Sequence, residues 1–114
     1  MREGKEIEDM IRQTYDRALD MEDMVEALGY FNKTFNGLEK AGYDVSEYRD
    51  DSLELVMDII LAEGEDIVEN QNEYEGLRYV GDNFKRIEDA GYNISIYKPD
   101  YIYMFEDYTG LILN

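Results

Sequence analysis

The sequence of 114 residues contains no cysteine, no histidine and no tryptophan, and it has a single proline. Without cysteine there is no disulfide framework, no thiolate nucleophile and no zinc–thiolate site. Without histidine the commonest general base and the commonest transition-metal ligand are missing. The composition therefore predicts a protein that is not an enzyme and needs no cofactor.

Long apolar runs are also missing. The chain begins Met1-Arg2-Glu3 without an apolar run of the signal-peptide type, and no stretch approaches the roughly 20 apolar residues of a membrane span. We therefore expect a cytoplasmic protein that does not insert into a membrane.

Basic residues are scarce, and acidic residues dominate the charge. Only 11 Lys and Arg face 28 Asp and Glu, which leaves a net charge of −17. Such a charge repels nucleic acid and anionic membranes and attracts basic protein surfaces. The alternative is that the acidity only serves solubility. With 44% apolar residues, 11 Tyr and four Phe, the chain has enough core material to fold despite its charge.

An internal repeat organises the chain. Residues 30–51 (YFNKTFNGLEKAGYDVSEYRDD) match residues 79–100 (YVGDNFKRIEDAGYNISIYKPD) without gaps at an offset of 49 residues. So many matching positions favour duplication of a supersecondary unit. We expect one domain over residues 1–114, with repeat unit 1 at 1–50, repeat unit 2 at 51–99 and a C-terminal segment at 100–114.

Apolar residues recur at helical spacing through most of the chain. The pattern predicts a first helix over about residues 4–19 and a second from an N-cap at Asp20 to a left-handed C-cap at Gly42. Gly29 could break the second helix. Asp51 and Glu54 resemble a capping pair that opens a third helix.

A fourth helix follows and ends at Gly91, which repeats the cap at Gly42. The predicted fold class is mainly α: a small helical bundle built from two duplicated helical-hairpin units. The C-terminal segment is either a helix or a small β-hairpin. The repeat favours the helix, with Pro99 in its first turn and four residues directed inward: Ile102, Phe105, Thr109 and Ile112.

The carboxylates are the remaining candidates for chemistry. They fall at polar positions of amphipathic helices, where solvated faces are expected. Neither a D-x-[DN]-x-[DN]-G calcium loop nor a G-x-x-x-x-G-K phosphate loop occurs. We therefore expect no catalytic residues, no dedicated metal site and no direct binding to nucleic acid.

The acids are densest in the predicted third helix and around it. In this stretch Glu54, Asp58, Glu65 and Glu69 follow a 4-7-4 spacing, which places them on one helical face. Carboxylates one turn apart lie about 5–6 Å from each other, on the scale of DNA phosphates. Tyr15, Tyr48 and Tyr74 could add contact area at the edges. The predicted partner-binding residues are Asp50, Asp51, Glu54, Asp58, Glu65, Asp66, Glu69 and Glu73.

Small size, excess acid, helical build and missing catalytic residues together resemble the DNA-mimic inhibitors of phages and mobile elements, which include anti-restriction and anti-CRISPR proteins. The resemblance implies a homodimer that blocks the basic nucleic-acid-binding cleft of a DNA-processing or defence enzyme. The competing interpretation is a helical protein–protein adaptor or a small phage or bacterial structural protein. An acidic chaperone or antitoxin-like partner of one basic protein lies between the two.

Overall fold

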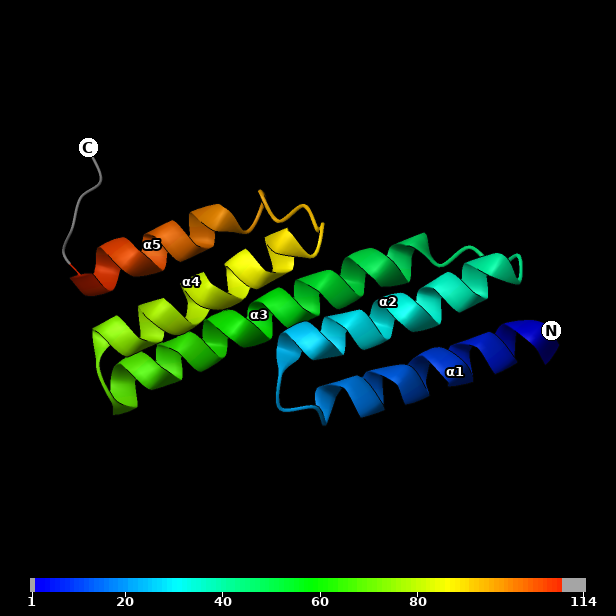
Figure 1. Cartoon of the computed structure of the whole chain (residues 1–114). Coiled ribbons are helices and arrows are strands. Elements are labelled where there is room, and N and C mark those ends of the chain that lie inside the picture. Colours follow the sequence, from blue (N-terminus) through cyan, green and yellow to red (C-terminus); the bar gives the residue numbers. More distant parts are fainter. Residues whose placement is uncertain (1, 110–114) are drawn as a thin grey trace. The chain divides into compact units, whose positions relative to one another are not determined.

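The computed structural model describes the backbone of residues 2–109 and the side chains of residues 5–103. Within residues 2–109 the chain forms five α-helices and no strand, which confirms the predicted mainly α class (Figure 1). The helices are α1 (Arg2–Leu19), α2 (Met24–Lys40), α3 (Ser46–Asn70), α4 (Glu73–Asp89) and α5 (Lys98–Thr109).

The helices belong to two compact units. The N-terminal unit comprises residues 1–56 and the C-terminal unit comprises residues 57–114, so the division falls inside α3. In the N-terminal unit, antiparallel α1 and α2 pack side by side, and in the C-terminal unit α5 packs against α4 (Figure 1). The predictions of one domain and of repeat boundaries at residues 50 and 99 stay predictions.

The core of the N-terminal unit comes mainly from one face of α2. Ala27, Leu28, Phe31, Phe35 and Leu38 are all buried there, at the three- and four-residue spacing of a helix. The ring of Tyr15 on α1 lies edge-on to that of Phe31, with 4.8 Å between ring centroids.

The first residues of α2 and α3 differ from those predicted. Asp23, not Asp20, is the N-cap of α2, because its carboxylate accepts hydrogen bonds from the backbone N–H groups of Val25 and Glu26. α2 continues through Gly29 without a break. α3 begins at Ser46, so Asp51 and Glu54 lie inside the helix rather than at its start.

The glycine caps were predicted correctly. Gly42 and Gly91 adopt φ angles of 98° and 99°, a left-handed region that costs glycine little. The chain then turns back, and the N–H of the following tyrosine donates to a carbonyl of the preceding helix, Tyr43 to Leu38 and Tyr92 to Ile87. This pattern satisfies carbonyls at the helix end.

A charged cluster fastens the end of α2 to the start of α3 in the N-terminal unit. The Arg49 guanidinium donates to the side-chain oxygens of Asn32 and Asn36, each at 2.6 Å, and forms an ion pair with Glu39. Its Cζ lies 5.7 Å from the centroid of the Phe35 ring. The planar guanidinium can contact all three polar partners because it donates hydrogen bonds in several directions at once.

The C-terminal unit has a simpler arrangement at the equivalent place. Lys98 takes the position of Arg49 and forms an ion pair of 2.7 Å with Glu88, the counterpart of Glu39. The ring of Tyr101 packs on that of Phe84 at 5.5 Å between centroids, and its hydroxyl donates to the Leu77 carbonyl at 3.2 Å.

The C-terminal segment is helical over residues 98–109, as the repeat predicts, with Pro99 in the first turn of α5. One of the four residues predicted to face inward does not do so. Ile102 is 43% exposed, and Tyr101 makes the contact with α4 instead. Phe105, Thr109 and Ile112 lie outside the residues whose side chains are described.

Candidate functional site

The strongest candidate for a functional surface lies on the second half of α3 and the first residue of α4, in the C-terminal unit. Five predicted residues are here, and all are exposed: Asp58, Glu65, Asp66 and Glu69 on α3, and Glu73 on α4. At 100° per residue, Asp58, Glu65 and Glu69 fall within about 40° of one another around the helix axis. We call these five residues the acidic face.

The other three predicted residues belong to the N-terminal unit. Asp50, Asp51 and Glu54 lie on the first half of α3, and all three are exposed.

Burial, with smaller contributions from Asp51 and Tyr48, raises the pKa of the Tyr15 hydroxyl. The half-buried ring of Tyr15 packs on Phe31, whereas Tyr74 is 68% exposed.

Basic neighbours do not neutralise the acidic face. Ion pairs join Arg49 to Glu39, Arg78 to Asp82 and Lys98 to Glu88. Within the part of the chain that the structure describes, no residue of the acidic face forms an ion pair. Its charge is therefore directed at the solvent.

Three residues of the acidic face lie near the C-terminal end of α3, which is unfavourable for acids. The C-terminal end of a helix carries a partial negative charge, so acids there cost about 0.3–1 kcal/mol each at exposed sites. Glu65, Asp66 and Glu69 occupy the last turns of α3, and its last turn contains no basic residue. Glu65 and Glu69 are also like charges at i, i+4, which repel one another. Their arrangement does not stabilise the helix.

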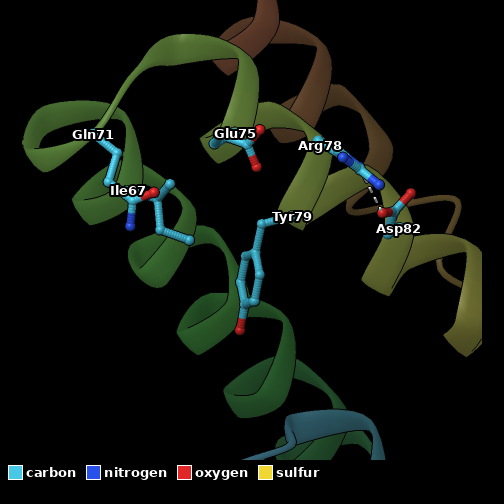
Figure 2. A pocket seen from close by; sticks show the side chains of 6 residues that line it. All are labelled: Ile67, Gln71, Glu75, Arg78, Tyr79 and Asp82. Carbon is cyan, nitrogen blue, oxygen red and sulfur yellow. Dashed lines mark ion pairs between the residues drawn. The ribbon is translucent and has the colours of Figure 1, made fainter.

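A shallow hollow of about 270 Å³ lies between the end of α3 and the first turns of α4 (Figure 2). Its lining residues are Ile67, Gln71, Glu75, Arg78, Tyr79 and Asp82. Tyr79 reaches from α4 toward α3, where its hydroxyl donates to the Glu63 carboxylate. The Arg78 guanidinium lies 3.6 Å from Asp82.

Sequence reasoning did not identify this hollow. The repeat offered one signal for Tyr79, the residue that reaches across the hollow. Tyr79 corresponds to Tyr30 by the 49-residue offset, and both tyrosines are half-buried. The side chains that line the hollow offer hydrogen bonds and an apolar wall. They do not pair a nucleophile with a base, which is the arrangement that covalent catalysis requires.

Gly76 allows α3 and α4 to approach closely near the acidic face. A Cβ at Gly76 would lie 2.6 Å from the carbonyl oxygen of Gly64 and 2.9 Å from the backbone nitrogen of Val68, and it would also meet the Val68 side chain. Glycine is required here by space, because φ is not in the left-handed region. The contact fixes the first turn of α4 against the last turns of α3.

Two features are absent from the described residues. No group of three or more acidic side chains there converges closely enough to hold a metal ion. None of the helices in the same part of the chain has the length and apolar character needed to cross a membrane.

Comparison with known proteins adds no relative from which residue roles could be transferred. No protein-family model, curated protein or solved structure matches this chain.

Proposed function

We propose that this protein is a non-catalytic inhibitor whose acidic face occupies the basic nucleic-acid-binding cleft of a DNA-processing or defence enzyme, in the manner of anti-restriction or anti-CRISPR proteins. The observation that supports the proposal is the position of the acidic face. Its acids are exposed, they form no ion pair within the described residues, and Glu65, Asp66 and Glu69 lie in the last turns of α3, where the helix dipole opposes acids.

The acids on α3 extend over a length that spans several phosphates of a DNA strand. From Asp58 to Glu69 the helix axis advances by roughly 16 Å at about 1.5 Å per residue. Four exposed carboxylates lie along this length, at axial intervals of about 10.5, 1.5 and 4.5 Å, compared with one phosphate every roughly 3.4 Å along a DNA strand. A cleft lined with Lys and Arg would gain from binding such a row by releasing counterions of its own.

Acidity that served solubility alone would be distributed differently. Acids at helix N-termini give the same net charge and also stabilise the helix. Exposed acids on α1 alternate with Lys5, Arg12 and Arg17, whereas α3 has no basic residue after Arg49. The excess is therefore concentrated on α3.

The experiment is a capture from bacterial lysate with tagged protein, eluted with a salt gradient, with and without excess duplex DNA. We expect to recover a nucleic-acid enzyme that salt and DNA both displace. The test variant combines Asp58→Asn, Glu65→Gln and Glu69→Gln, and the control combines Glu6→Gln, Asp9→Asn and Asp16→Asn on α1.

Both variants remove three exposed charges, so they change net charge equally. Loss of the complex with the first variant alone supports the acidic face. If both variants weakened the complex equally, binding would depend on the net charge of the protein and not on the acidic face. A partner that resists both salt and DNA would instead indicate an adaptor held by apolar anchors.

We also propose that the two halves arose by duplication, as the 49-residue offset indicates. Asp23 and Asn72 are equivalent by this offset, and both are N-caps. Asp44 and Asn93 are equivalent as well, and each accepts hydrogen bonds of matching length from the serine two residues on. The similarity of the two halves thus extends to capping and turn geometry.

A further inference from the structure

We infer that the hollow between the end of α3 and the first turns of α4 is a binding site for an arginine side chain of a protein partner (Figure 2). The hollow is separate from the row of acids on α3. Asp58, Glu65 and Glu69 lie about 160–180° around the axis of α3 from Ile67, which lines the hollow. The inference therefore does not depend on the proposed inhibitory function.

One wall of the hollow places an aromatic ring between two carboxylates. Glu75, Tyr79 and Asp82 follow one another at i, i+4 and i+7 on α4, so they lie on one side of that helix. Ile67 near the end of α3 and Gln71, one turn farther on, form the opposite wall. Because a water molecule occupies about 30 Å³ in the liquid, a volume of about 270 Å³ has room for the head group of a long side chain.

The ring of Tyr79 is held in position before any ligand arrives. Its hydroxyl donates a hydrogen bond to Glu63 on α3, so the side chain spans the gap between the two helices. A ring that is already fixed loses little conformational freedom when a planar cation stacks on it. The guanidinium group of arginine is planar and stacks on aromatic faces, whereas the ammonium group of lysine is a compact and strongly hydrated charge. The ring therefore favours arginine over lysine.

Glu75 supplies a carboxylate that has no partner within the described part of the chain. Its side chain is half-buried, and there it accepts no hydrogen bond and forms no ion pair. The other carboxylate of this wall, that of Asp82, is paired with Arg78 at 3.6 Å. A cation that donates two parallel hydrogen bonds to a partly desolvated carboxylate makes a stronger contact than it would at an open surface. Charge complementarity therefore selects a guanidinium group as the ligand of Glu75.

The N-terminal unit shows that the fold does not require these carboxylates. By the 49-residue offset, Glu63 corresponds to Thr14, and Asp82 corresponds to Lys33. The tyrosine and one acid in the first turn of its helix are common to both units. The C-terminal unit thus has two carboxylates more than the N-terminal unit around the equivalent ring, and one base fewer at the position of Asp82. These differences make the hollow a better site for a cation than for an anion.

The test is a titration of the full chain with capped tripeptides, followed by NMR amide shifts at about 0.15 M salt, where the Debye length is only about 8 Å. The probes are Gly-Arg-Gly, Gly-Lys-Gly and the same tripeptide with citrulline, which has the shape of arginine without its charge. The test variant is Glu75→Gln. The control is Glu73→Gln, which removes the same charge from the same turn of α4 at about 200° around its axis.

We expect the arginine peptide to shift the amides of residues 67–82 with a Kd of about 1–10 mM. The lysine peptide should bind at least about threefold more weakly, and the citrulline peptide should not bind, because the ring prefers a planar group and the carboxylate requires a charge. Glu75→Gln should weaken the arginine peptide by about fivefold or more, and Glu73→Gln by less than about twofold, with unchanged circular dichroism.

Four results would overturn the proposal. The first is equal affinity for the arginine peptide and either of the other two peptides. The second is an equal effect of Glu75→Gln and Glu73→Gln. The third is a set of shifts that clusters on the acidic face instead of the hollow, since that pattern indicates attraction by charge alone. The fourth is a wild-type chain whose shifts do not approach saturation below about 30 mM arginine peptide.

Discussion

Replacing Gly76 by alanine should separate two effects that act in opposite directions. In an exposed helix interior, alanine is favoured over glycine by about 1 kcal/mol. At Gly76 the new methyl carbon would lie 2.6 Å from the Gly64 carbonyl oxygen and 2.9 Å from the Val68 nitrogen. Both are backbone atoms, so no side-chain rotation can relieve the overlap.

The size of the effect follows from that geometry. Non-bonded contacts of carbon lie near 3.5 Å, so α3 and α4 would have to separate locally by roughly 0.9 Å. Such overpacking typically costs about 1–3 kcal/mol, and the two backbone contacts place Gly76 at the upper end. Because alanine's helix preference offsets about 1 kcal/mol of this cost, we expect Gly76→Ala to lower the free energy of unfolding by about 2 kcal/mol.

Gly29 provides the matched control. It lies in the middle of α2, it is exposed, and a Cβ there would meet no atom within 4 Å. Gly29→Ala should therefore raise the free energy of unfolding by about 0.8–1 kcal/mol. Urea unfolding followed by far-ultraviolet circular dichroism measures both. If Gly76→Ala proved as stable as Gly29→Ala, the close approach of α3 and α4 would be wrong.

Four further predictions concern caps, the charged cluster, pH and salt. Asp23→Ala should cost about 1 kcal/mol in urea unfolding, because it removes the N-cap of α2, whereas Asp20→Ala should cost almost nothing; equal costs would contradict the observed cap. Arg49→Ala should cost about 1–2 kcal/mol, since it removes hydrogen bonds from a side chain only 28% exposed, and Lys98→Ala, at 48%, at most about 0.5. Hydrogen bonds from the side chain and, to a smaller extent, the backbone of Ser46 hold the pKa of Asp44 below its ordinary value. The stabilising contribution of Asp44 is therefore present above the ordinary pKa of aspartate and is lost as pH falls through the lowered pKa. A carboxyl titration by NMR that gave Asp44 the ordinary pKa of aspartate would contradict this prediction. Added salt should raise the melting temperature because it screens self-repulsion, and melts that coincide at low and moderate salt would refute a concentrated charge surface.

Much of the fold was predictable because helical periodicity and glycine caps are local signals. Gly42 and Gly91 mark the ends of α2 and α4 because the chain reverses there through a left-handed residue. The first residues of the helices were harder to predict, since three acids, Asp20, Glu22 and Asp23, lie in the connection before α2 alone. Asp20 and Asp23 are chemically equivalent as caps, and only the backbone path decides between them.

The C-terminal segment shows the limits of local propensity. Its tyrosines and isoleucines favour a strand, but the contact of Tyr101 with Phe84 and the hydrogen bond to the Leu77 carbonyl fix a helix. These contacts are tertiary and do not appear in any short window of sequence. The incorrect inward placement of Ile102 has the same origin, because the register of α5 depends on α4.

The candidate site was predictable in part. Spacing alone indicated that Asp58, Glu65 and Glu69 share one exposed face of a helix. It could not indicate which basic residues neutralise which acids, because Arg49 and Lys98 pair with partners about ten residues away. The close approach of α3 and α4 at Gly76 was equally inaccessible, since it depends on packing between helices.

The position of the unit boundary within α3 has a practical consequence for cutting the chain. The connections between helices lie at residues 20–23, 41–45, 71–72 and 90–97, each inside one unit rather than between the two. Proteases cleave most readily at exposed loops. Limited proteolysis should therefore yield fragments that lack part of one unit, and no loop cut releases either unit whole. A gene truncated at any loop would meet the same problem, so the two halves cannot be exchanged as separate modules without dividing a helix.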